Sequence, residues 1–151
     1  MNFDDVTQKI LSFPSKSLGT GVGDNEIEHI SRALEIPIGG GYRQFLVRFG
    51  WARIADFGLF GLGDGIPQYL HLVVNTESER TEAEPALPKH LLPIMNNGGG
   101  DLTCLDTRAS SDDPPVVVWW HEDGPDQVPE PTATNFLSWL SAMLDERSGA
   151  G

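Results

Sequence analysis

Three neighbouring side chains near the C-terminal third of the sequence could do chemistry. His121, Glu122 and Asp123 are consecutive, and imidazole and carboxylate groups are the side chains that bind zinc or relay protons. They follow the apolar run at residues 116–120, which is typical of a strand, and adjacent side chains of a strand point to opposite faces. We therefore interpret them as a solvated strand end, with a small hydrolase or metal enzyme as a remote alternative.

The other residue types used in catalysis do not stand in productive patterns. No two of the four histidines have the i, i+4 spacing of a metal-binding helix, and no serine stands in a G-x-S-x-G pattern. The single cysteine, Cys104, lies in an apolar run at residues 102–105, where a buried thiol is expected rather than a nucleophile. We predict no catalytic residue, no metal site and no cofactor.

Two runs of three glycines could in principle cradle a phosphate. The run at residues 98–100 is followed by Asp101 and an apolar segment, without the Lys-Ser/Thr pair of a P-loop. The run at residues 39–41 precedes a helical pattern, but no strand comes before it and no lysine closes it. We interpret both runs as turns.

Acidic residues are concentrated between Asp101 and Glu130. This stretch contains eight acidic residues and one arginine, Arg108, so it carries a net charge of −7 out of −12 for the chain. Two interpretations stay open: solvated loop carboxylates, or an acidic docking surface for a cationic protein. Because the acids flank opposite ends of the strand at residues 116–120, they need not form one surface.

The candidate partner-binding residues are five of these acids and two tryptophans that could anchor a partner. Tryptophan is more commonly a core residue, so the core stays the alternative for both. The seven candidates are Asp112, Asp113, Glu122, Asp123, Asp126, Trp51 and Trp120.

The composition excludes several classes of protein. The chain has 151 residues, of which 39% are hydrophobic, which suffices for one packed domain over residues 1–151. With 22 acidic and 10 basic residues it repels phosphate backbones and anionic lipids, so we expect neither nucleic acid nor a membrane as partner. No run of 18 apolar residues and no signal-peptide pattern is present, so a cytoplasmic protein is expected.

The spacing of apolar residues predicts helices first and strands later. It predicts a helix starting at Phe3, a loop over residues 13–23, a helix with Asn25 and Glu28 as a capping box, and a helix over residues 42–49. Short strands are expected at residues 53–54 and 57–62. Residues 68–84 are ambiguous: residues 69–74 could form a strand, but a helix over most of the segment is favoured.

The last third predicts a hairpin and a closing helix. Strands at residues 90–95 and 101–106 are joined by an Asn-Gly turn, and the strand at residues 116–120 is central because it is apolar on both faces. A loop over residues 124–131 leads to a helix that Thr132 or Thr134 caps. The expected fold class is α+β, an antiparallel or mixed sheet with N-terminal helices and a C-terminal helix packed on it.

Several of these segments also match known motifs in the same order. The segment LPKHLLPI at residues 87–94 runs into NNGGGD at residues 96–101, residues 136–140 read FLSWL, and Ile38, Tyr42, Phe45 and Leu46 precede them. These resemble the "LP..LIPIG.dGGGD", "F..FL" and "LP.DY..FL" motifs of the SMI1/KNR4 family, also called the SUKH superfamily. The likeness covers about residues 22–145. The chain departs from the family at Gly39, where proline is usual, and at residues 40–41 and 49–50.

The resemblance implies an α+β domain without enzymatic activity that binds another protein. Many bacterial members look like immunity proteins, which bind and neutralise a cognate toxin of a polymorphic toxin system, often a nuclease or deaminase. Such toxins are frequently basic because they approach phosphate, which a partner of charge −12 would complement. The alternative is a housekeeping adaptor or regulatory scaffold that binds a cellular protein. Nothing in the sequence indicates the oligomeric state.

Overall fold

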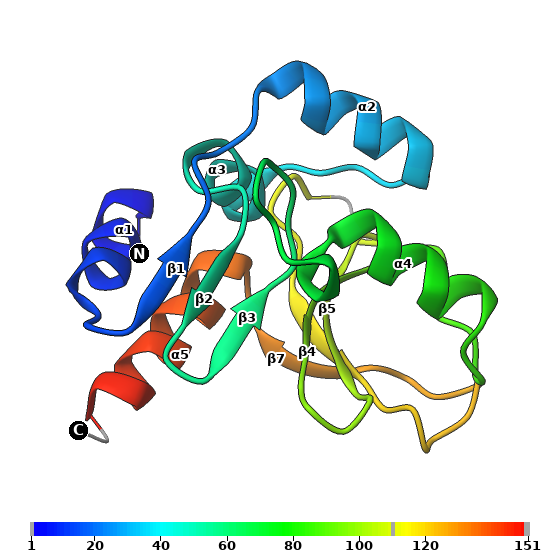
Figure 1. The fold of residues 1–151 in the computed structure, drawn as a ribbon. Coiled ribbons are helices and arrows are strands. Elements are labelled where there is room, and N and C mark those ends of the chain that lie inside the picture. The colour runs from blue at the N-terminus through cyan, green and yellow to red at the C-terminus, as the bar shows by residue number, and fades with distance from the viewer. Residues whose placement is uncertain (1, 110, 150–151) are drawn as a thin grey trace.

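The structure, a computed structural model, describes residues 2–109 and 111–149. Three helices lie within its first 48 residues, and the strands of its larger sheet follow one another after residue 90, before a closing helix (Figure 1). In chain order the elements are α1 (Phe3–Ser12), β1 (Lys16–Leu18), α2 (Asp24–Leu34), α3 (Gly40–Arg48), β2 (Ala52–Ile54), β3 (Phe57–Leu59), η1 (Gln68–Leu70), α4 (Leu72–Thr81), β4 (Leu91–Asn96), β5 (Leu102–Asp106), β6 (Val116–Trp119), β7 (Glu130–Ala133) and α5 (Phe136–Gly149).

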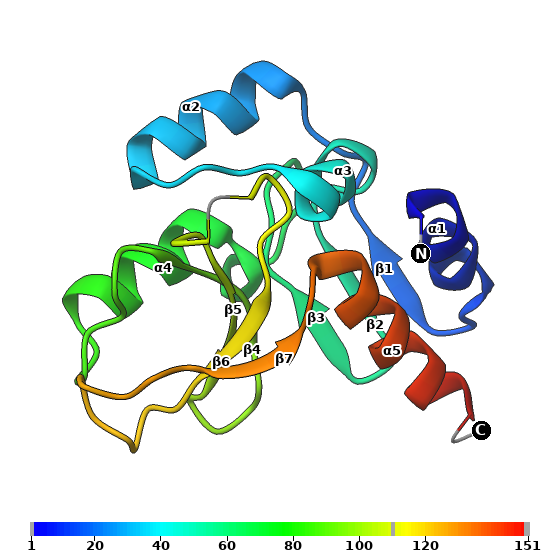
Figure 2. The ribbon, with the colours of Figure 1, turned by 180° about the vertical axis from the view of Figure 1, so that it is seen from behind.

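The strands form two antiparallel sheets, one of order β1-β2-β3 and one of order β4-β5-β6-β7. The predicted α+β fold class is therefore confirmed, and of the two expected sheet types, antiparallel or mixed, the sheets are antiparallel. The strand β6 lies inside the larger sheet, as its apolar sequence predicts. Figures 1 and 2 show α4 on one face of this sheet and α5 on the other.

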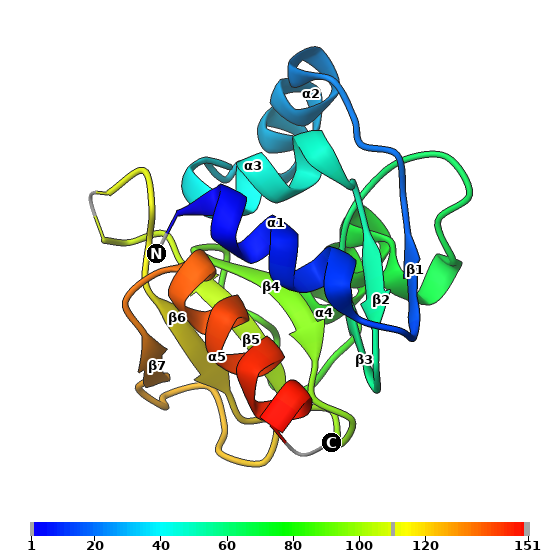
Figure 3. The ribbon, with the colours of Figure 1, turned by 90° about the vertical axis from the view of Figure 1, so that its left-hand side faces the viewer.

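One large apolar core connects the two sheets. It contains residues of β2, β3 and β4 and of all five α-helices, with Leu72 as the contribution of α4. Helix α1 packs beside α5 at the surface of this core (Figure 3). The backbone N–H of Phe60 donates to Ile94 O at 2.8 Å, and the buried Tyr42 hydroxyl donates to Phe60 O at 2.7 Å. A smaller cluster lies on the opposite face of the larger sheet and includes Leu87, Cys104 and Trp119.

Two strands and two helix caps differ from the sequence prediction. Strands β1 and β7 lie where loops are expected, because each is a short edge strand whose pairing depends on a distant or irregular partner. Helix α2 starts at Asp24 after Gly23, without a side-chain cap, so the predicted capping box is wrong. Helix α5 is capped by Asn135, whose Oδ1 accepts from Ser138 N at 2.9 Å, and not by a threonine.

Among the residues that the structure describes, no helix has the length and apolarity needed to cross a membrane.

Candidate functional site

The candidate acids lie in two loops that leave opposite ends of β6 (Figures 1 and 2). Loop 107–115 connects β5 to β6 and contains Asp112 and Asp113. Loop 120–129 connects β6 to β7 and contains Glu122, Asp123 and Asp126. The structure therefore does not bring the five acids together, and the two loops must be considered separately.

Loop 107–115 folds onto the N-terminus of α3. The Asp113 carboxylate accepts a hydrogen bond from Gly41 N at 3.2 Å, where the helix has no side-chain cap of its own. A carboxylate at this position also interacts favourably with the positive end of the helix dipole. Asp113 is half-buried and acts within the fold, whereas Asp112 is exposed beside it.

The glycines at residues 39–41 permit this approach. Gly40 has a φ of +60°, and a Cβ on it would lie 2.7 Å from the carbonyl oxygen of Asp112. Gly40 and Gly41 belong to the first turn of α3 rather than to a separate turn, which corrects that part of the sequence interpretation. The anion at this helix end is the chain's own Asp113.

Loop 120–129 is held in place by Gln127. The Gln127 amide accepts from Trp120 N at 2.9 Å and donates to Trp120 O at 2.6 Å and to Gly124 O at 3.0 Å. These three bonds close the loop onto the end of β6. The loop is thus ordered by its own hydrogen bonds while its acidic side chains are exposed, with the Glu122 carboxylate 3.7 Å from His121 Nε2.

Two apolar side chains stand exposed beside the acids of this loop. Trp120 is 36% exposed and Val128 is 88% exposed, although valine and tryptophan ordinarily find cover. Glu122, Asp123 and Asp126 are also exposed. We call these five residues the loop 120–129 surface; Val128 is absent from the sequence prediction because nothing in its acidic, proline-rich segment indicates its exposure.

His121 pairs with Asp101 instead of forming a reactive centre with its neighbours. Its Nδ1 lies 2.7 Å from Asp101 Oδ1, and its backbone N–H donates to the same oxygen at 3.0 Å. Burial raises the pKa of Asp101, but the backbone N–H and the ring of His121 outweigh it and hold that pKa below its usual value. Within residues 2–109 and 111–149 no group of three or more His, Cys, Asp or Glu side chains could hold a metal ion.

The remaining candidate, Trp51, lies in the core. It is 8% exposed, and the glycine at position 19 contacts its ring so closely that a Cβ there would lie 2.6 Å from the indole nitrogen. Trp51 is therefore a core residue, as the alternative interpretation predicts, and Trp120 is the more exposed of the two tryptophans. Cys104 is fully buried in β5, and burial raises the pKa of its thiol, so it is not an activated nucleophile.

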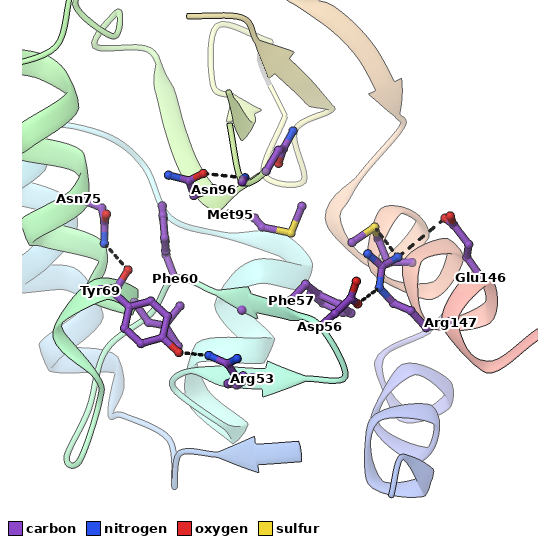
Figure 4. A pocket seen from close by; sticks show the side chains of 15 residues that line it. Arg53, Asp56, Phe57, Phe60, Tyr69, Asn75, Met95, Asn96, Glu146 and Arg147 are labelled. Carbon is purple, nitrogen blue, oxygen red and sulfur yellow. Dashed lines mark hydrogen bonds and ion pairs between the residues drawn. The ribbon is translucent and has the colours of Figure 1, made fainter. Parts of the chain in front are cut away.

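A cavity of about 680 Å³ opens between the β2–β3 hairpin, η1, the end of β4 and the end of α5 (Figure 4). The sequence prediction misses it because its polar residues, Arg53, Tyr69, Asn96 and Arg147, come from four distant segments. The side chains of Arg53 and Tyr69 are hydrogen-bonded to each other at its edge.

Comparisons with known proteins agree with this architecture. A crystal structure titled as a protein from Pseudomonas syringae pv. tomato superposes with a TM-score of 0.62 at 16% identity, over 82% of this chain and 90% of the other, and so shares the fold. No curated protein matches the chain. A family model described as SMI1-KNR4 cell-wall, of the SUKH group, matches residues 24–140. The chain therefore belongs to the SMI1-KNR4 family of the SUKH superfamily.

Proposed function

We propose that this protein is an immunity protein that binds and neutralises a basic toxin of a polymorphic toxin system in the bacterial cytoplasm. The family is generally non-catalytic, and its role points to protein–protein interaction as the general kind of function. The observation that carries the proposal is the loop 120–129 surface, where exposed Trp120 and Val128 stand among three exposed carboxylates.

This arrangement has the chemistry of a binding site for a cationic protein. Aromatic residues surrounded by a polar rim supply most of the binding energy at protein interfaces. Carboxylates around them attract a basic partner over distance and raise the association rate. The hydrogen bonds of Gln127 hold the loop before binding, which reduces the entropy lost when a partner docks.

The charge of the whole chain supports the same kind of partner. A net charge of −12 steers a basic nuclease or deaminase toward the protein and repels the nucleic acid that such a toxin attacks. Occupying the basic surface of the toxin would also block its access to phosphate. The protein acts in this scheme as one domain and needs no cofactor.

The test is binding to the product of the adjacent reading frame. We expect that purified product to bind this protein, to lose toxicity or enzymatic activity when bound, and to bind at least about tenfold more weakly when salt is raised from about 0.05 to about 0.5 M. Absence of binding would contradict the immunity role. Tight binding without salt dependence would contradict the electrostatic mechanism.

A family adaptor for a cellular protein is the other outcome of this test. It is indicated if the neighbouring product does not bind but a basic cellular protein binds and loses affinity when Trp120 is replaced by alanine.

A further inference from the structure

We propose that the 680 Å³ cavity beside Arg53 binds a peptide segment that carries a carboxylate next to an apolar side chain. Its volume lies within the range of roughly 300–1,000 Å³ that ligand sites occupy. The inference rests on the proposed function in one respect: it takes the natural ligand to be a segment of a protein partner.

The floor of the cavity is apolar. Phe57, Phe60 and Met95 line it and are themselves buried, with exposed fractions of 7%, 2% and 8% (Figure 4). Phe57 is fixed by the guanidinium of Arg147, which lies 4.8 Å from its ring centroid. An aliphatic or aromatic side chain on this floor would leave water and gain free energy from burial.

One edge of the cavity presents hydrogen-bond donors that have no acceptor. Arg53 donates one N–H to the Tyr69 hydroxyl, so the proton of that hydroxyl is free to be donated. The other N–H groups of Arg53 meet no acceptor, and its guanidinium pairs with no carboxylate, among the residues that the structure describes. Arg53 is exposed on β2, so a ligand can reach it.

The asparagines at the end of β4 offer further donors from another side of the same cavity (Figure 4). Asn96 Oδ1 accepts from Gly98 N at 2.8 Å, and Asn97 Oδ1 accepts from the Thr103 hydroxyl at 2.8 Å. Because both amide oxygens are engaged, the side-chain NH₂ groups are the parts left for a ligand. The donors of Arg53 and Tyr69 on one side and of the asparagines on another complement a hydrogen-bond acceptor, and the guanidinium of Arg53 favours an acceptor of negative charge.

The two acidic residues of the cavity lie beside Arg147. Asp56 accepts from Arg147 Nε at 2.7 Å, and Glu146 lies 3.9 Å from the same guanidinium. Arg147 carries one positive charge against these two carboxylates, and with Arg53 the four charged residues that line the cavity sum to zero. The positive charge that a ligand meets is therefore local to Arg53, whose guanidinium pairs with no carboxylate among the described residues. A carboxylate bound bidentately to a guanidinium is the strong form of this contact.

The cavity adjoins the loop 120–129 surface through one turn of the chain. Asn96, Asn97 and Gly98 line the cavity, and Asp101 at the end of the same turn pairs with His121. One protein partner could therefore contact both, with its basic surface on the loop and an acidic, apolar segment in the cavity.

The experiment is a titration of the ¹⁵N-labelled protein with acetyl-Phe-Glu-Leu-amide, compared with acetyl-Phe-Gln-Leu-amide. We expect the glutamate peptide to bind with a Kd of about 1 mM and to shift the Arg53 Nε–H signal and the Asn96 and Asn97 side-chain signals. The glutamine peptide should bind at least about tenfold more weakly, because a hydrogen bond to a charged group contributes more than a neutral one.

Variants locate the contact. Arg53→Gln should reduce affinity for the glutamate peptide to that of the glutamine peptide, and Tyr69→Phe should reduce it by a smaller factor. Arg32→Gln, at an exposed arginine outside the cavity, is the matched control and should change nothing. Thermal unfolding of each variant verifies that the fold is intact.

Equal binding of the two peptides, shifts confined to other surfaces, or no shift at about 10 mM glutamate peptide would each overturn the proposal. Because the probe is a synthetic peptide, failure here leaves the immunity role standing. Failure of the neighbouring product to bind would leave the peptide result standing.

Discussion

The two acidic loops at the ends of β6 differ in what their carboxylates contact. In loop 107–115, the Asp113 carboxylate caps α3 and is used within the fold. The glycines at the start of that helix leave space for the loop to approach. In loop 120–129, Gln127 makes the hydrogen bonds, so the acids and two apolar side chains are left exposed. The comparison teaches that acidic density alone does not identify a docking surface, because a carboxylate that caps a helix of its own chain is less available to another protein than an exposed one.

Among single substitutions, the largest expected effect concerns the apolar centre of the loop 120–129 surface. Replacing Trp120 with alanine should weaken partner binding by about 2 kcal/mol, roughly thirtyfold, because tryptophan at the centre of an interface is a typical hot spot. Val74→Ala, at a similarly exposed apolar residue on α4, is the control and should leave affinity unchanged. Titration calorimetry measures the affinity of both variants. Equal losses of affinity would mean that Trp120 is no more important for binding than an exposed apolar residue on α4.

The next effect concerns the packing of loop 107–115 on α3. Gly40→Ala should reduce the free energy of unfolding by about 2 kcal/mol, because its φ is +60° and the added Cβ would crowd the backbone of Asp112. Gly99→Ala is the control, since a Cβ there meets nothing within 4 Å. Urea unfolding compares the two, and an unchanged Gly40→Ala midpoint would show that the loop does not pack as described.

A smaller loss is expected when the cap itself is removed. Asp113→Ala should cost about 1 kcal/mol of stability, since α3 then loses the carboxylate that accepts from Gly41 N and the favourable charge at its N-terminus. Asp112→Ala removes the same charge from the same loop without removing a hydrogen bond and should be nearly neutral. If both substitutions have equal effects on urea unfolding, charge repulsion and not capping governs this loop.

The smallest effect on stability is expected for a substitution in loop 120–129. Gln127→Ala should change the free energy of unfolding by less than about 0.5 kcal/mol but accelerate amide exchange at Trp120, whose N–H loses its acceptor. Gln8→Ala on the exposed face of α1 is the control. Unchanged exchange at Trp120 would mean that Gln127 does not hold the loop.

Much of the fold is predictable from local patterns. Apolar residues at helical spacing place α1, α3 and α5, and the run of valines in β6 places a central strand. Strands β1 and β7 are missed because they are short and polar: β1 reads KSL and β7 contains Pro131, and their partners make them strands.

The candidate site is less predictable because its distinctions depend on distant contacts. The cap from Asp113 to Gly41 spans 72 residues, so the sequence does not separate this acid from those of loop 120–129. The pair of Arg53 and Tyr69 likewise joins a strand to a short helix in a cavity that only the folded chain assembles.

The most direct test compares two triple charge reversals that change net charge equally. The first replaces Glu122, Asp123 and Asp126 with lysine; the second replaces Asp112, Glu77 and Glu82, which are all exposed. Glu79 is avoided because it is partly buried, which raises its pKa.

Affinity for the proposed basic partner, measured at about 0.15 M salt, gives the result. The first variant should lose at least about 100-fold and the second less than about threefold, because contacts at the interface outweigh the screened charge of distant residues. Equal losses would mean that net charge alone attracts the partner, and a larger loss in the second would place the interface elsewhere.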